Sequence, residues 1–242
     1  MNPSRCVFAS FAAIALSASL AAAVGVPVGH IQLNDSFGTT NGGEFRATEQ
    51  ADFTVVTVNT GTNFQGGVVT AANLFETFCV EKFEHIGFGT SYAASINTTT
   101  HASDSNYAGG AHGGYDDPID ARTAYLYTNF MNHTLAAGYD YANATNRAGD
   151  ADALQKAIWY IEQEDSTALT GKALTLFNEA NNAVNSGAWT GLGDVRVLNL
   201  TTNAGADAQD QLVMIVTSIP LPGAASMAGL GLVGVAARRR RR

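Results

Sequence analysis

The chain has 242 residues, with 21 Asp and Glu against 13 Lys and Arg, which gives a formal net charge of −8. The stretch from Val24 to Ile219 holds all 21 acidic residues and seven of the 13 basic ones, so its net charge is 7 − 21 = −14. A nucleic-acid-binding body is excluded because it needs a basic face to neutralise phosphates. Collagen-like and coiled-coil classes are excluded because neither a Gly-x-y period nor sustained heptads occur.

The first 23 residues have the composition of a secretory signal peptide. Arg5 supplies a positive start, an apolar run extends from Val7 to Leu20, and Ala21-Ala22-Ala23 offers the small residues that a signal peptidase accepts. The alternative is a membrane anchor, for which the apolar run is short. We expect cleavage after Ala23 and export of the remaining chain.

Residues 219–242 form a second terminal segment with three distinct parts. Pro220-Leu221-Pro222 is followed by an uncharged stretch, Gly223 to Ala237, and then by Arg238, Arg239, Arg240, Arg241 and Arg242. As a helix, the 17 residues from Leu221 to Ala237 would span about 25 Å, the short limit for crossing a bilayer. The arginine cluster would then stay on the cytoplasmic side. A soluble helix with a basic tail is the alternative, but the segment has no polar face.

In its order of parts this tail resembles the PEP-CTERM class of bacterial sorting signals, in the variant with a V-P-L-P-A-like start. Leu221 stands where glutamate is usual, and Gly223 stands where alanine is. The resemblance implies a didermal bacterium that makes extracellular polysaccharide and an exosortase-type membrane enzyme that processes the tail. It also implies that the protein is held in the membrane by the C-terminal helix before processing, and then resides in the cell envelope, at the cell surface or in the extracellular matrix.

Residues 24–218 are expected to form one exported α+β body. Dense β-branched and apolar runs predict strands at Phe53–Val58, Leu74–Val80, Tyr92–Ile96, Asp194–Leu200 and Gln211–Thr217. Apolar residues at helical spacing predict helices from Pro118 to about Leu135, from Asp150 or Asp152 through Glu164, and from Ala173 to Val184, with Gly187 placed to end the last. This order predicts a mostly antiparallel β-sheet or sandwich with an inserted bundle of about three helices.

Cys79 would be the only cysteine of the exported chain, because Cys6 leaves with the signal peptide. Exported proteins usually pair their cysteines, so a lone one indicates an intermolecular bond, an inert buried thiol or a thiol used for chemistry. On the second predicted helix, Gln155 borders the buried stripe and Trp159 lies one turn further on the same side. The Gln155 carboxamide could therefore point into the domain, screened from water by Trp159.

At these two segments the body resembles the bacterial thioester domains of surface adhesins. Phe78-Cys79-Val80 is similar to their aromatic-Cys-apolar triplet, and Gln155-Lys156-Ala157-Ile158-Trp159 to their T-Q-x-A-I-W-like segment, with Leu154 where threonine is common. The resemblance implies an internal thioester between the Cys79 sulfur and the Gln155 side-chain carbonyl, shielded by Phe78 and Trp159. It implies one stoichiometric attachment to an amine-bearing surface or matrix partner, rather than enzymatic turnover, and it implies no cofactor.

Two other functions stay open. In the first, Cys79 is merely buried and the protein is a non-reactive structural component of the exopolysaccharide or biofilm matrix. In the second, it is a carbohydrate-active enzyme with a carboxylate pair. The sequence favours a solvated acidic face for the carboxylates concerned, which are Glu76, Glu81, Glu84, Glu162 and Glu164.

No metal is expected from the spacing of the remaining polar residues. The run from Asp116 to Asp120 lacks the spacing of a calcium loop and is predicted to be a turn and helix cap. The histidines also lack metal-binding spacing, so we expect loop and surface positions for His85, His101, His112 and His133.

Overall fold

The structure is a computed structural model that describes residues 25–38, 42–57, 73–101 and 117–216. The expected signal peptide (1–23) and sorting signal (219–242, with Pro220, Pro222 and the arginine cluster) lie outside the described residues. Within the described ranges, no helix is long and apolar enough to cross a membrane.

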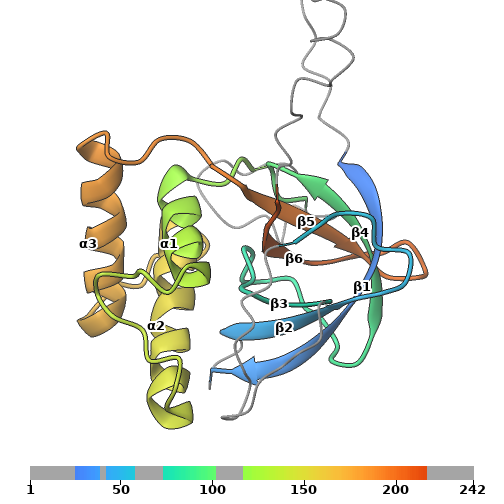
Figure 1. Cartoon of the computed structure of the whole chain (residues 1–242), viewed down its shortest axis with the longest axis horizontal. Helices are drawn as coiled ribbons and strands as arrows, with labels where there is room; N and C mark the ends of the chain where they lie inside the picture. The colour runs from blue at the N-terminus through green and yellow to red at the C-terminus, as the bar shows by residue number, and fades with distance from the viewer. Residues whose placement is uncertain (1–24, 39–41, 58–72, 102–116, 217–242) are drawn as a thin grey trace, which may run out of the picture.

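The described chain contains six strands and three helices in the order strands, helices, strands, which confirms the α+β prediction (Figure 1). The elements are β1 (Val26–Phe37), β2 (Glu44–Glu49), β3 (Leu74–Thr77), β4 (Ser91–Asn97), α1 (Ala121–Met131), α2 (Ala144–Ile161), α3 (Gly171–Asn185), β5 (Val195–Thr201) and β6 (Asp207–Met214).

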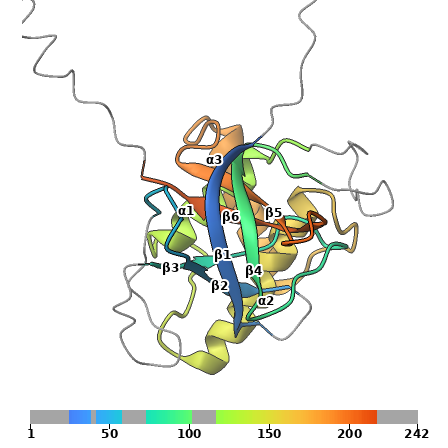
Figure 2. The ribbon, with the colours of Figure 1, turned by 90° about the vertical axis from the view of Figure 1, so that its right-hand side faces the viewer.

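The strands form a single antiparallel sheet in the order β3-β2-β1-β4-β5-β6. β1 and β4 lie side by side at its centre (Figure 2). The chain just after β3 also pairs with β6, since the Val80 N–H donates to the Asp210 carbonyl and the Leu212 N–H to the Phe78 carbonyl, both at 3.0 Å. The two edge strands therefore meet, and the sheet curls on itself. The six described strands belong to this one sheet and not to the two sheets of a sandwich.

The core has two main parts, one on each side of the sheet. The helices pack to one side of the sheet in Figure 1 and bury the predicted stripe of α2, formed by Leu154, Ala157, Ile158 and Ile161. The other cluster lies among the strands and includes Ile31, Leu33, Phe75, Leu198 and Val213. The helical periodicity of the sequence thus identified the buried face of α2 correctly.

The start of α2 was predicted wrongly. The helix begins at Ala144, and its N-cap is Asn143, whose side chain accepts hydrogen bonds from the backbone N–H groups of Thr145 and Asn146. Asp150 and Asp152, the expected caps, lie inside the helix. The first two turns carry few apolar residues, so the apolar period alone placed the start too late.

The strand predicted at Phe53–Val58 is also absent from the described part of that segment, 53–57. The Phe53 N–H donates to the Gln50 carbonyl in a turn, and only Thr57 makes an isolated bridge, to Ile215. β-branched residues favour a half-buried surface, and that preference does not by itself provide a pairing partner. In β1, by contrast, a bulge at Gly29, where φ is 109°, interrupts the alternation that would have revealed the strand.

The other expected elements agree with the structure to within a few residues. Asp120 caps α1 by accepting a hydrogen bond from the Arg122 N–H, as predicted for the turn before that helix. Gly187 follows the C-cap of α3 with φ 74°, a left-handed conformation that favours glycine.

Candidate functional site

Cys79 is held in place by the meeting of the two sheet edges. It lies two residues beyond β3 and forms an antiparallel bridge with Gln211 of β6. The backbone bonds on either side, from Val80 and to Phe78, fix its extended conformation. Its side chain is fully buried.

Gln155 of α2 reaches this same point, although 76 residues separate it from Cys79. The Cys79 thiol donates to Gln155 Oε1, with Sγ and Oε1 3.2 Å apart. The Cys79 backbone N–H donates to the same oxygen at 3.2 Å, and Gln155 Nε2 donates to the Cys79 carbonyl at 2.8 Å. The carboxamide therefore pairs with the Cys79 backbone much as a neighbouring strand would. The pair expected from the sequence is brought into contact.

A third segment completes the surroundings of the Gln155 carbonyl. The Gly43 N–H, at the start of β2, donates to Gln155 Oε1 at 3.2 Å. Two backbone N–H groups, one just before β2 and one just after β3, thus point at one carbonyl oxygen. Such a pair of donors is the arrangement that stabilises the oxyanion formed during acyl transfer.

Gly42 and Trp159 cover the pair. A Cβ at position 42 would overlap the Trp159 ring and lie 2.7 Å from Gln155 Cγ, so the backbone of Gly42 packs directly on both side chains. Trp159 is only 4% exposed, as the expected shielding role requires. Phe45 completes a small apolar cluster with Cys79 and Trp159, and the half-exposed Phe88 ring packs on Phe45 with centroids 5.8 Å apart.

Phe78 lies elsewhere. Successive side chains of an extended chain point to opposite sides, so Phe78 points away from the side that Cys79 faces. It belongs to the core cluster beneath the helices and packs edge-to-face on Phe130, with ring centroids 5.0 Å apart. In the structure Phe45, rather than Phe78, accompanies Trp159 beside the sulfur.

A buried arginine ties together the three segments that supply the site. Arg147 of α2 is fully buried and donates from Nε and Nη2 to Glu44, at 2.9 and 2.5 Å, and from Nη2 to Glu76 at 2.7 Å. Tyr139 also donates to Glu44, at 2.7 Å. Glu44 follows Gly43 in β2, and Glu76 precedes Cys79 by three residues. The ion pairs therefore hold β2, β3 and α2 at fixed positions relative to one another.

The electrostatic surroundings oppose ionisation of the thiol. Burial raises the pKa of Cys79 well above its ordinary value, and the nearby carboxyl groups of Glu81 and Glu164 raise it further. The Cys79 backbone and the nearby Trp159 side chain act in the opposite direction and lower the pKa of the thiol. The neutral thiol is accordingly the stable form in the folded protein.

The acidic side chains expected on a solvated face are mostly inside the protein. Glu76, Glu81, Glu84 and Glu164 are each less than 9% exposed. Burial raises the pKa of Glu164 to about 7 and also raises the pKa of Glu81, which lies beside Asp210. The interpretation as a solvated acidic face is therefore wrong. In the described ranges, no group of three or more His, Cys, Asp and Glu side chains is arranged to hold a metal ion.

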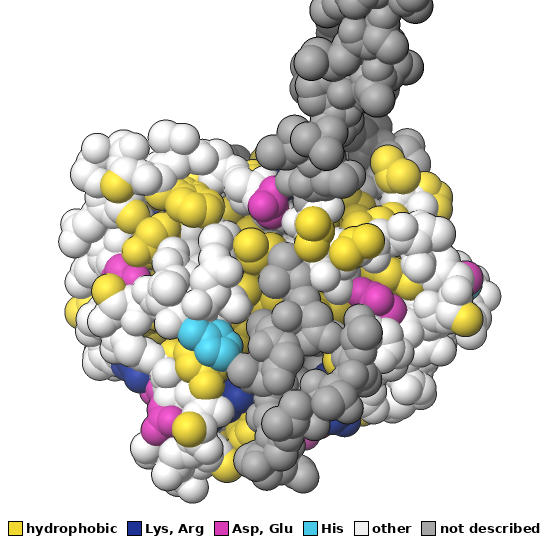
Figure 3. Space-filling view, viewed as in Figure 1, with side chains coloured by type: hydrophobic (Ala, Val, Ile, Leu, Met, Phe, Trp, Pro, Cys, Tyr) yellow, Lys and Arg dark blue, Asp and Glu magenta, His cyan; other side chains and the backbone are white. Residues whose placement is uncertain are grey.

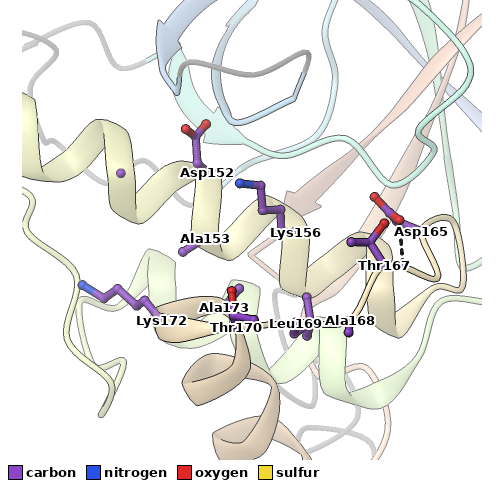
Figure 4. Close-up of a pocket in the computed structure, with 11 residues that line it drawn as sticks. Asp152, Ala153, Lys156, Asp165, Thr167, Ala168, Leu169, Thr170, Lys172 and Ala173 are labelled. Carbon is purple, nitrogen blue, oxygen red and sulfur yellow. Dashed lines mark hydrogen bonds between the residues drawn. The ribbon is translucent and has the colours of Figure 1, made fainter.

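A separate pocket of about 450 Å³ lies between α2 and the start of α3 (Figure 4). Lys156 and Asp152 line it from α2, and the Asp165 side chain, which accepts a hydrogen bond from the Thr167 N–H, lies at its other end. Its lining includes neither Cys79 nor Gln155. On the face seen in Figure 3, the few Lys and Arg side chains are scattered.

Comparisons with known proteins return no relative: no family model, no curated protein and no solved structure matches this chain.

The sequence identified Cys79, Gln155 and Trp159, but it missed Gly42, Gly43, Phe45 and Arg147. The adjacent glycines Gly42 and Gly43 were the only sequence signal that the segment between β1 and β2 contributes to the site. The contact between Gly43 and Gln155 spans 112 residues, so it depends on a topology that no local pattern specifies.

Proposed function

We propose that Cys79 and Gln155 form an internal thioester, through which the protein attaches covalently to an amine-bearing surface or matrix partner. The observation that carries this proposal is the 3.2 Å contact between Cys79 Sγ and Gln155 Oε1, inside a fully buried site with two backbone N–H groups on the same oxygen. The resemblance of both segments to thioester domains supports the same chemistry.

Formation of the bond needs only these two side chains. The Cys79 sulfur adds to the Gln155 amide carbon, the C–N bond breaks, and the thiol proton leaves with the nitrogen as ammonia. During this step negative charge develops on Oε1, where the N–H groups of Gly43 and Cys79 can stabilise it. The product is an acyl electrophile in a site closed by Gly42 and Trp159, where exclusion of water slows hydrolysis.

Attachment then follows by attack of a partner amine on the same carbonyl carbon. A C–N bond forms, the C–S bond breaks with the electron pair going to sulfur, and the amine loses a proton to solvent. The result is an amide between the partner and Gln155, with Cys79 returned to the thiol form. The event happens once per molecule, because nothing regenerates the thioester.

Intact mass spectrometry of the chain, purified without reducing agent, tests this proposal. We expect a mass deficit of one ammonia, which is absent in Cys79→Ala and is replaced by a gain of methylamine on treatment with that amine. Cys79→Ser is the matched control, because it preserves the size of the side chain and loses the thiol. A chain of full mass with a titratable thiol would overturn the proposal.

The termini support a proposed location at the cell surface or in the extracellular matrix. Residues 1–23 would direct export, and residues 219–242 would hold the chain in the membrane until an exosortase-type enzyme processes it. Expression in a didermal host with and without an exosortase tests this, by mass analysis of the N- and C-termini in each cell fraction. Retention of the full-length chain in the cytoplasm of both hosts would contradict it.

One observation favours the alternative of a non-reactive structural component of the matrix. The unreacted Gln155 carboxamide already has partners on both its oxygen and its nitrogen, so it stabilises the fold without any covalent bond. In that case the full-mass chain is the native form, and Gln155→Ala lowers the free energy of unfolding but changes no partner attachment.

A further inference from the structure

The indole N–H of Trp159 is a buried donor in the same apolar cluster as Cys79, and it has no hydrogen-bond partner among the described residues. The Trp159 side chain is 4% exposed. The ring packs in the same small cluster as Cys79, and the Trp159 side chain lowers the pKa of the thiol. A buried N–H without an acceptor is unfavourable, so its position beside a neutral sulfur calls for an explanation.

We propose that Trp159 is a catalytic residue, whose indole N–H donates to the Cys79 sulfur whenever that sulfur carries negative charge. The proposal rests on the thioester function. A neutral thiol or thioester sulfur is a weak hydrogen-bond acceptor, whereas a thiolate is a strong one. The Trp159 N–H therefore contributes little in the resting state and forms a hydrogen bond once the sulfur is charged. Stabilisation confined to the charged state is what accelerates a reaction.

The thiolate arises at a defined moment of the chemistry. When a partner amine has added to the Gln155 carbonyl carbon, the tetrahedral intermediate collapses and the C–S bond breaks. The electron pair goes to Sγ, the Trp159 N–H donates to it, and a proton from solvent then converts the thiolate to the thiol. The oxygen and the sulfur would thus each have a dedicated donor, since the Gly43 and Cys79 N–H groups serve Oε1.

The other groups around the sulfur leave this role to Trp159. The carboxyl groups of Glu81 and Glu164 repel a thiolate. The Lys82 ammonium lies 5.8 Å from the centre of the Trp159 ring and is paired with Asp165 at 2.6 Å. Among the causes that lower the pKa of the thiol in the described part of the chain, the Trp159 side chain stands beside the Cys79 backbone.

Replacement of the indole N–H tests the proposal. Trp159→Phe removes the N–H but leaves a smaller ring, so a second variant carries benzothienylalanine at position 159, in which sulfur replaces N–H in a bicyclic ring of the same shape. We expect the methylamine opening rate of the thioester to fall about tenfold in both variants, the effect of losing one charge-assisted hydrogen bond. Trp189→Phe is the matched control, because the Trp189 indole donates to the Gly191 carbonyl away from the site.

A second readout works even if no thioester forms, so that failure of this proposal can be told apart from failure of the proposed function. With Cys6→Ser and Gln155→Met in place, the pH titration of the ¹³Cβ resonance of Cys79 reports the thiolate directly. We expect the benzothienylalanine variant to titrate about one pH unit higher than the chain with Trp159, at unchanged melting temperature. The catalytic role of Trp159 would be overturned if the two chains gave the same titration curve, including the case in which neither thiol titrates. Equal rates of thioester opening by methylamine would overturn it as well.

Discussion

Arg147 donates two parallel hydrogen bonds to Glu44, at 2.9 and 2.5 Å. Glu44 directly follows Gly43, whose N–H donates to Gln155. Arg147 and Gln155 belong to the same helix, eight residues apart, or about 12 Å along its axis. The helix thus binds β2 at two points, once through an ion pair and once through the carbonyl of the Gln155 carboxamide. Helix α2 therefore fixes both the acceptor, Gln155 Oε1, and, through the Arg147–Glu44 pair, the donor, which is the Gly43 N–H.

Removal of the Arg147 guanidinium should therefore destabilise the folded protein strongly. Arg147→Met leaves Glu44 and Glu76 buried without their cation, and we expect the free energy of unfolding to fall by about 3–5 kcal/mol in a urea titration. Arg122→Met is the control, because its ion pair with Asp120 is partly exposed and should contribute about 0–1 kcal/mol. Equal losses in the two variants would contradict the linking role of Arg147.

Gly42→Ala should damage the site, because its Cβ would overlap the Trp159 ring and press on Gln155. We expect a loss of about 1–3 kcal/mol in unfolding free energy, typical of an overpacked core, together with faster loss of the mass deficit to hydrolysis. Gly149→Ala in α2 is the matched control, since a Cβ there meets nothing within 4 Å. It should stabilise the helix by up to about 1 kcal/mol. If Gly42→Ala left the unfolding free energy unchanged, the packing of Gly42 against Trp159 and Gln155 would be shown to adapt freely to an added methyl group.

The folded protein should lose stability as the pH rises from about 5 to 7. Burial raises the pKa of Glu164 to about 7, so in this interval its carboxyl group binds a proton in the folded chain and releases it in the unfolded one. The stabilisation is complete below the unfolded pKa, near 4.5, and is lost as the pH passes the folded value, with a slope of up to about 1.4 kcal/mol per pH unit.

Glu164→Gln should flatten that pH dependence, as measured by urea titrations at several pH values. Asp165→Asn provides the contrast. Hydrogen bonds from Lys82 and Thr167 lower the pKa of Asp165 to about 2, so this group stays ionised throughout the interval and its replacement should leave the slope unchanged. An unchanged slope in Glu164→Gln would show that other carboxyl groups with raised pKa values, such as Glu44 and Glu162, dominate.

The Cys79 thiol should be unreactive in the folded state when no thioester is present. In a chain with Cys6→Ser and Gln155→Met, burial both blocks access and raises the pKa of the thiol. We expect a colorimetric disulfide reagent at pH 8 to react at least about a hundredfold more slowly than with the same chain in urea, because only the thiolate reacts. Rapid labelling of the folded chain would show that Trp159 and Gly42 do not seal the site.

The sequence predicted those parts of the fold that a local pattern encodes. The apolar stripe of α2 at Leu154, Ala157, Ile158 and Ile161 is buried as its spacing requires. The start of that helix was missed because an asparagine cap, and not an apolar residue, defines it.

The sequence pointed to Cys79 and Gln155 through two short segments, whereas it could not reveal the groups that support them. Arg147 looks like any charged residue on a polar helical turn, and its burial depends on Glu44, 103 residues away. Carboxylates were likewise expected in solvent, because sequence composition carries no information about which acids a cation or a strand edge will enclose.

The meeting of the two sheet edges has a temporal consequence. Cys79 is held by β6, the last described strand of the chain, so a chain that ends before Asp207 lacks the pairing that aligns the thiol with Gln155. During vectorial synthesis or export the N-terminal parts emerge first, and the bridge to Gln211 can form only near the end. Under the proposed function, the thioester would therefore form only after the whole domain has been translocated and folded, so the electrophile would not meet the thiols and amines of the cytoplasm.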